Sequence, residues 1–202
     1  MKKMLVFISL LLATSAAQCM SPLELAAKRK DLNEQLMNVI NDSLSFNLET
    51  DKYNIKNLLR DGAEIGYVSS KGQTPLEAAI HRNNLELAKF LIENHADVNR
   101  EDDLRMTPLI YATYFDNKYF IKYLLGVPEI DVNKIFKHKE YENQAYKNQT
   151  ALDIAYEKPN WSKPESYIEK SLNEKRNDII QMLLAAGAKT YKELLQESEQ
   201  KS

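Results

Sequence analysis

Three histidines and a single cysteine are the side chains of this sequence that could most readily bind a metal ion or act as a nucleophile. The histidines are His81, His95 and His138, and no two of them stand four residues apart, as a pair of ligands on one helical turn would. A zinc site needs three or four converging ligands, and Cys19 is distant from the histidines along the chain. The sequence therefore predicts no metal and no cofactor.

One short cluster could supply general acid–base chemistry. His138 is followed by Lys139, Glu140 and Glu142, which is a run typical of a solvated loop. The sequence contains neither a glycine-rich phosphate loop nor a nucleophile elbow. We therefore expect a protein that is not an enzyme. The alternative is a catalytic site built on this cluster, which would need a deep pocket joining His138, Glu140 and Glu142.

The segments between these residues repeat along the chain. Thr107 follows Thr74 at an interval of about 33 residues, which is a period typical of stacked repeats. Ala63 and Ala96 precede these two threonines at equal distances. A threonine at a helix start can accept a backbone N–H, and a proline at the first helical position loses no hydrogen bond. The three copies are residues 72–79 (Gly-Gln-Thr-Pro-Leu-Glu-Ala-Ala), 106–112 (Met-Thr-Pro-Leu-Ile-Tyr-Ala) and 149–155 (Gln-Thr-Ala-Leu-Asp-Ile-Ala).

This period and the Thr-Pro-Leu-x-x-Ala core resemble the ankyrin repeat. The resemblance implies an all-α fold, an ankyrin-repeat α-solenoid of about four helix pairs with short β-hairpin fingers and two insertions. Gly62 and Gly187 align where the backbone leaves the second helix of a pair in a left-handed conformation. Asn83 and Asp116 stand where the family ends its first helix with glycine, and both residue types tolerate that conformation.

Two insertions and two ends complete the predicted organisation. The first insertion falls mostly in residues 134–148 and lengthens the hairpin finger before the third copy, and the second falls in residues 157–172 between the two helices of that copy. Helices are expected at about 22–41 and 51–59, with a short extended piece possible between them. We assign residues 1–17 to a signal peptide, 18–50 to an N-terminal helical capping region, 51–189 to the ankyrin repeat domain, and 190–202 to a capping helix through Leu195 with a polar tail.

The N-terminus has the composition of a secretory signal peptide. Lys2 and Lys3 precede an apolar run over residues 4–13, and small residues stand before a cleavage point after Ala17. The run is shorter than the 20 or so residues that span a bilayer, so we expect no membrane span after cleavage. We predict an exported protein, periplasmic or secreted. Two alternatives are a retained membrane anchor and acylation of Cys19, although Gln18 precedes that cysteine where lipoprotein signals carry a small residue.

Net charge limits the class of partner. The chain has a formal charge of −2, and removal of residues 1–17 takes away two lysines and no acid. A mildly acidic protein is a poor ligand for nucleic acid, so we expect none. The mature chain has no internal disulfide because its only cysteine precedes the repeats. We expect a monomer stabilised by packing.

The resemblance implies a protein partner and a contact surface. In ankyrin repeat proteins the fingers and first helices form a concave face that contacts partners, which predicts a non-enzymatic protein–protein interaction module. Either Tyr114 and Phe115 are both exposed, or one of them packs against the neighbouring helix. A structural envelope component held by a retained or lipidated N-terminus is the alternative function. The positions carried over are His81, Arg82, Asp103, Leu104, Met106, Tyr114 and Phe115, with Phe136 and Tyr141 added from the finger insertion.

Overall fold

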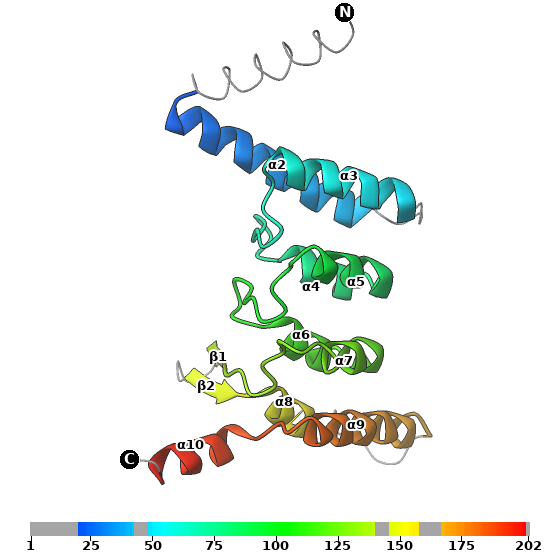
Figure 1. Ribbon diagram of the computed structural model, residues 1–202. Coiled ribbons are helices and arrows are strands. Elements are labelled where there is room, and N and C mark those ends of the chain that lie inside the picture. The colour runs from blue at the N-terminus through cyan, green and yellow to red at the C-terminus, as the bar shows by residue number, and fades with distance from the viewer. Residues whose placement is uncertain (1–19, 43–47, 140–145, 158–166, 201–202) are drawn as a thin grey trace, which may run out of the picture.

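Helix pairs stack on one another along a single direction in a computed structural model of the chain (Figure 1). The structure describes residues 20–42, 48–139, 146–157 and 167–200, so the predicted signal peptide and Cys19 lie outside it. The elements are α2 (Pro22–Asp42), α3 (Leu48–Asp61), α4 (Pro75–His81), α5 (Leu85–Glu93), α6 (Pro108–Tyr114), α7 (Lys118–Leu124), β1 (Phe136–Lys139), β2 (Tyr146–Gln149), α8 (Ala151–Glu157), α9 (Tyr167–Ala185) and α10 (Tyr191–Glu199).

Side-chain caps fix where the central helices begin. The hydroxyls of Thr74 and Thr107 accept the backbone N–H three residues further on, at the starts of α4 and α6. The amide oxygens of Asn84 and Asn117 do the same for α5 and α7. Such a cap satisfies a backbone donor that the helix cannot, and its removal costs about 1 kcal/mol. The threonine caps confirm the prediction, whereas the asparagine caps were not anticipated.

Residues with positive φ follow the ends of several helices. Asn83 has φ of 54° after α4, and Asp116 has φ of 53° after α6, as predicted for the residues in place of glycine. Gly62 and Gly187 have φ of 111° and 80° after α3 and α9. These turns return the chain so that consecutive helices lie antiparallel, and their spacing maintains the repeat.

One continuous hydrophobic core runs through the stack. The first helices α2, α4, α6 and α8 pack side by side in that order, and α9 packs on α7. Burial of one large aliphatic side chain contributes about 1.5–3 kcal/mol. No pair could bury both of its faces alone, so the neighbours complete the core. Its fully buried large side chains include Leu36, Ile55, Leu87, Leu91, Leu109, Phe120, Leu124, Leu152 and Ile179.

Asparagine side chains connect the turns of neighbouring repeats. The Oδ1 of Asn99 accepts the N–H of Asp131 at 2.8 Å, and the Oδ1 of Asn133 accepts the N–H of Lys189 at 2.7 Å. Gly66 occupies the equivalent position one repeat before Asn99 and has no side chain to make such a bond. The amide bridges therefore hold the later turns of the stack together.

The structure confirms the hairpin finger and adjusts several helix ends. β1 and β2 pair antiparallel within the first insertion, with Phe136 opposite Gln149. Leu48 already belongs to α3, so an extended piece cannot include it, while residues 43–47 lie outside the described residues. The later part of the second insertion is helical from Tyr167. α10 continues to Glu199, beyond the predicted end at Leu195.

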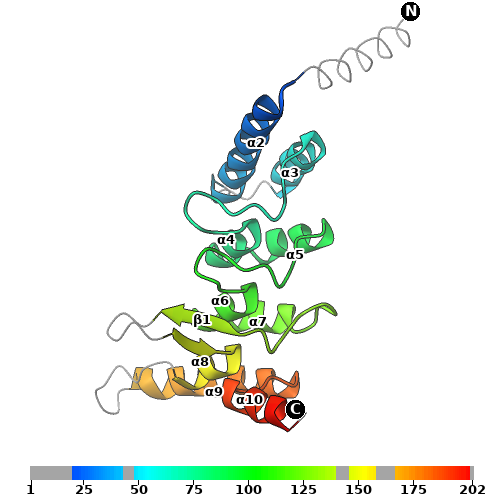
Figure 2. The same cartoon turned by 90° about the vertical axis from the view of Figure 1, so that its left-hand side faces the viewer.

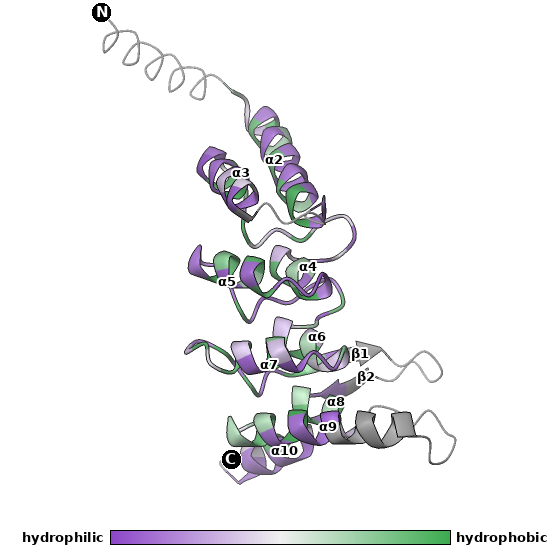
Figure 3. Cartoon of the chain, turned by 90° about the vertical axis from the view of Figure 1, so that its right-hand side faces the viewer, coloured by the Kyte–Doolittle hydropathy of each residue, from purple (hydrophilic) through white to green (hydrophobic). Residues whose placement is uncertain are grey.

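Helices near both ends of the stack are rich in hydrophilic residues. Hydrophilic residues predominate in α3 at one end and in α10 at the other (Figure 3). A polar outer face is what a terminal repeat needs, because no further repeat covers it. Among the described residues, no helix combines the length and apolar character needed to cross a membrane.

Candidate protein-binding surface

Two fingers with the same turn project beside the first helices (Figure 2). Residues 69–73 form one turn and residues 102–106 form the other, one repeat further on. Gly72 and Arg105 are left-handed at the same point, with φ of 78° and 68°. The N–H of Asp103 donates to the carbonyl of Gly72 at 3.1 Å, which joins the fingers. A Cβ at position 72 would lie 3.0 Å from the Cβ of Asp103, so only glycine fits there without a shift.

Four rings gather where α4 and α6 end, and we call them the aromatic patch: His81, Tyr111, Tyr114 and Phe115. The Phe115 ring lies 4.7 Å from Tyr111, 5.3 Å from Tyr114 and 6.3 Å from His81, measured between centroids. These spacings and the tilted or edge-on orientations are those that favour aromatic contact. Phe115 therefore stands at the centre of the patch.

The patch is open to solvent above a buried base. Tyr114 is 51% exposed and Phe115 is 53% exposed, while Tyr111 is only 5% exposed. The sequence left two arrangements open, and the structure has the one in which Tyr114 and Phe115 are both exposed. The inward position on α6 is occupied by Tyr111. His81 and Tyr114 end equivalent helices of successive repeats, so the repeat itself brings them together.

The structure corrects the predicted surface at two positions. Met106 and Phe136 are 8% and 6% exposed and belong to the hydrophobic core. Met106 turns inward after the left-handed residue Arg105, and Phe136 turns inward at the start of β1 while Lys137 is exposed. Tyr141 lies outside the described residues. The remaining predicted residues His81, Arg82, Asp103 and Leu104 are exposed.

A network of ion pairs fixes the second finger against the first insertion. Glu101 lies 3.6 Å from the guanidinium of Arg105 and 3.5 Å from the ammonium of Lys134. These residues line a cavity of about 390 Å³ together with Asp131, Asn133, Ile135 and Lys137. Exposed pairs of this kind contribute only about 0–1 kcal/mol each, so they add little to the stability of the finger.

A buried carboxyl group lies beneath the fingers, and sequence analysis did not single it out. Glu77 is fully buried on α4, and burial raises its pKa to about 8, with the charges of Asp102 and Asp103 adding to the rise and the Thr74 N–H opposing it. Its Oε2 accepts the Thr74 N–H at 3.0 Å, while Oε1 has no hydrogen-bond partner. The one feature of the sequence that could have indicated a buried carboxyl is the position of Glu77 between Leu76 and Ala78, inside an otherwise apolar motif.

Two observations on the described residues bear on catalysis. Glu77 is neutral at pH 7 and has no path to a substrate, because its side chain is fully buried. No group of three or more histidine, cysteine, aspartate or glutamate side chains within the described ranges could hold a metal ion. Glu140 and Glu142 of the predicted acid–base cluster lie outside those ranges.

Comparison with known families agrees with this architecture. The pattern described as "Ankyrin repeats (3 copies)" matches residues 23–136, which is more than half of the chain. The chain belongs to the ankyrin repeat family. Ankyrin repeats generally mediate protein–protein interaction and are typically not enzymatic. The matched residues include the fingers, the aromatic patch and the helices that support them.

Similar curated proteins contain this repeat within longer chains. The ankyrin repeat and SAM domain-containing protein 6 of Rattus norvegicus is 41% identical over 67 residues, which is 33% of this chain and 8% of that protein. The putative ankyrin repeat protein FPV230 of fowlpox virus is 40% identical over 60 residues, 30% of this chain and 32% of that protein. Alpha-latrotoxin-Lg1a of Latrodectus geometricus is 27% identical over 97 residues, 48% of this chain and 7% of that protein. The chain thus spans less than a third of the length of each of these relatives.

Proposed function

We propose that this ankyrin repeat protein is an exported, non-enzymatic module that binds another protein through the aromatic patch and the adjoining fingers. The observation that carries the proposal is the exposure of two neighbouring aromatic side chains, Tyr114 at 51% and Phe115 at 53%. Large aromatic residues are enriched among the few positions that dominate binding energy in protein interfaces.

The surroundings of the patch favour binding without large rearrangement. Tyr111 beneath it is buried, and Thr113 on the same helix donates its hydroxyl to the Leu109 carbonyl at 2.8 Å. A rigid, preformed surface loses little conformational entropy on association. Arg82 next to His81, and Asp103 and Leu104 on the second finger, are exposed and offer both signs of charge and one leucine to a partner. The expected partner is a folded protein or segment that presents an apolar side chain to the rings and polar groups to the rim.

The binding proposal is tested by affinity capture with a matched pair of variants. In the test variant, Tyr114→Ala and Phe115→Ala remove the exposed rings of the patch. In the control variant, Tyr53→Ala and Tyr119→Ala remove rings that are 67% and 70% exposed on α3 and α7. A partner retained by the parent and the control, but lost by the test variant, supports the proposal. Equal capture by both variants, with unchanged thermal unfolding, contradicts it.

Export is tested separately by intact mass. The proposed signal peptide covers residues 1–17, so the protein recovered outside the cytoplasm is expected to begin at Gln18. A chain that retains residues 1–17 contradicts the cleavage, as does one that gains an acyl group on Cys19. Either result would favour the alternative of a component held in the envelope by its N-terminus.

A further inference from the structure

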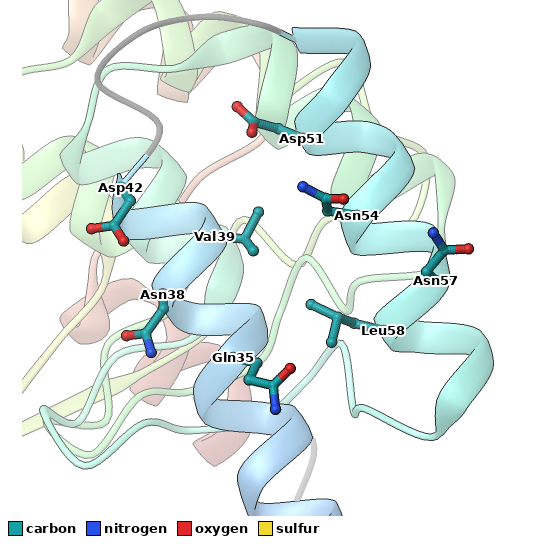
Figure 4. A pocket seen from close by; sticks show the side chains of 8 residues that line it. All are labelled: Gln35, Asn38, Val39, Asp42, Asp51, Asn54, Asn57 and Leu58. Carbon is teal, nitrogen blue, oxygen red and sulfur yellow. The ribbon is translucent and has the colours of Figure 1, made fainter.

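A groove runs between α2 and α3 at the N-terminal end of the stack (Figure 4). Its volume is about 550 Å³, and the described residues that line it all come from these two helices. α2 contributes residues at spacings of three and four, as one face of a helix does, and α3 does the same. The lining residues are Gln35, Asn38, Val39 and Asp42 from α2, with Asp51, Asn54, Asn57 and Leu58 from α3.

On α2, the groove lies away from the fully buried face of the helix. On α2 the buried residues Leu36, Met37 and Ile40 occupy the opposite side of the helix from the groove stripe. Val39 and Leu58 are half-buried and pack against the core cluster, so they form an apolar floor. Figure 4 shows Leu58 and Asn54 of α3 directed toward Val39 of α2. The walls above this floor are polar.

The charged groups in the groove have one sign. Among the described residues that line it, Asp42 and Asp51 are the ionisable ones, and amides supply the other polar groups. No ion pair within the described residues uses either carboxylate. Two basic residues of α3 point elsewhere, because Lys52 and Lys56 lie over the Phe90 ring of α5 at 5.8 and 5.6 Å from its centroid. The third, Arg60, lies 3.5 Å from Asp61. α3 therefore presents cations to α5 and anions and amides to the groove.

We propose that this groove binds an arginine or lysine side chain from an extended segment of a partner protein. Carboxylate and amide oxygens are the acceptors that a guanidinium or ammonium group needs. The aliphatic stem of such a side chain packs on apolar surface while its charged end reaches acceptors, which fits the floor of Val39 and Leu58. A carboxylate-bearing ligand would instead meet two like charges. The site is separate from the aromatic patch, so its test does not depend on whether the proposed function is correct.

The test is an NMR titration of the purified full chain with short peptides. The probes are acetyl-Gly-Arg-Gly-amide and the same peptide with glutamine or glutamate in place of arginine. We expect the arginine peptide to shift the side-chain amide signals of Asn38, Asn54 and Asn57 at least ten times more per unit concentration than either other peptide. Equal shifts with the glutamine peptide would overturn the proposal. A third titration uses spermidine. Tighter binding of spermidine than of the arginine peptide would contradict the proposal that the bound cation belongs to a protein.

Variants locate the binding and exclude a folding defect. Asp42→Asn with Asp51→Asn is expected to weaken binding of the arginine peptide at least tenfold, whereas Asp61→Asn, an exposed carboxylate outside the groove on the same helix, leaves it unchanged. Asn54→Lys places a cation inside the groove from the chain itself and is expected to abolish binding, while Asn54→Gln retains it. The proposal would be overturned if both the double variant and Asn54→Lys bound the arginine peptide with an affinity within twofold of the parent. Circular dichroism checks that each variant keeps its helical content.

Discussion

The two central repeats, residues 69–99 and 102–132, have the same backbone and differ in what they bury. Their threonine caps, fingers and left-handed turns recur at equivalent positions. At one pair of equivalent positions the first repeat buries the carboxyl of Glu77 and the second buries Ile110. At another the first has Gly72 and the second has Arg105, both with positive φ. A few positions therefore specify the backbone, while the others can diverge at an energetic cost.

The largest expected effect tests what the two repeats share. Leu76 and Leu109 are equivalent and are 2% and 1% exposed. Leu76→Ala and Leu109→Ala should each lower the free energy of unfolding by about 2–5 kcal/mol, because each leaves a cavity in the common core. Urea denaturation measures both. Leu104→Ala is the control, since its side chain is 64% exposed. A cost below about 1 kcal/mol at either core position would contradict the shared role.

The next effect tests the buried carboxyl of Glu77, which the first repeat has and the second lacks. Glu77 has an ordinary pKa of 4.5 and a pKa of about 8 in the folded chain. Between these values the unfolded chain has lost the proton and the folded chain retains it, so the stability from this group falls by up to about 1.4 kcal/mol per pH unit as pH rises.

Replacing this carboxyl with the residue of the second repeat should remove its pH dependence. Glu77→Ile is expected to flatten the fall in stability between pH 5 and pH 8, measured by urea denaturation at several pH values. Glu93→Gln, a site on α5 outside the core, is the control and should leave the slope as it was. An unchanged slope in Glu77→Ile would show that other groups cause the pH dependence. Asp102, whose pKa burial also raises, would be the next candidate.

A smaller effect is expected at the finger turns. A residue with a Cβ loses about 1–2 kcal/mol in a left-handed conformation, so Arg105→Gly should stabilise the chain by about 1 kcal/mol after the loss of a weak ion pair with Glu101. Gly72→Ala should destabilise it, because the new Cβ meets Asp103 as well. Thermal unfolding measures both changes. Arg105→Ala keeps the strain, and a gain as large as that of the glycine variant would refute this explanation.

The smallest effect concerns the start of the second helices. Leu85 begins α5 and packs against the core, whereas Lys118 begins α7 and pairs with Asp178 at 3.1 Å. Lys118→Ala should change stability by at most about 1 kcal/mol because both charges are exposed, and Leu85→Ala should cost more. A double-mutant cycle with Asp178→Ala measures the pair itself. A coupling above about 1 kcal/mol would show that the ion pair replaces the missing apolar contact.

Features that depend on local backbone chemistry could be predicted from the sequence. The threonine caps follow from residue types and a fixed interval, the left-handed residues Asn83 and Asp116 and the hairpin in the first insertion follow from the resemblance to the ankyrin repeat, and the structure confirms them. Such features need no knowledge of distant neighbours, because a helix end or a turn selects its residues within a few positions.

Features that depend on neighbouring elements could not be predicted in this way. Met106 and Phe136 occupy finger positions that the pattern marks as variable, yet both fill the core. Tyr111 is buried, whereas Tyr114 and Phe115 are exposed. The sequence did not decide which of these aromatic residues would pack inward. The environment of Glu77 depends on Asp102 and Asp103 of the next finger. Only the packing of one repeat on another decides each of these cases.

The asparagine bridges have a mechanical consequence. Within the first helix pair, Asn33 of α2 accepts the N–H of Glu64 at 2.7 Å, and Asn99 and Asn133 join successive turns further along, whereas Gly66 has no side chain to bond the following turn. A force applied between the two ends would load these contacts in series, so the interface with the fewest bonds would yield first. The pair of α2 and α3 would then detach as one unit, and the extension of the chain under tension would begin with a step at that joint.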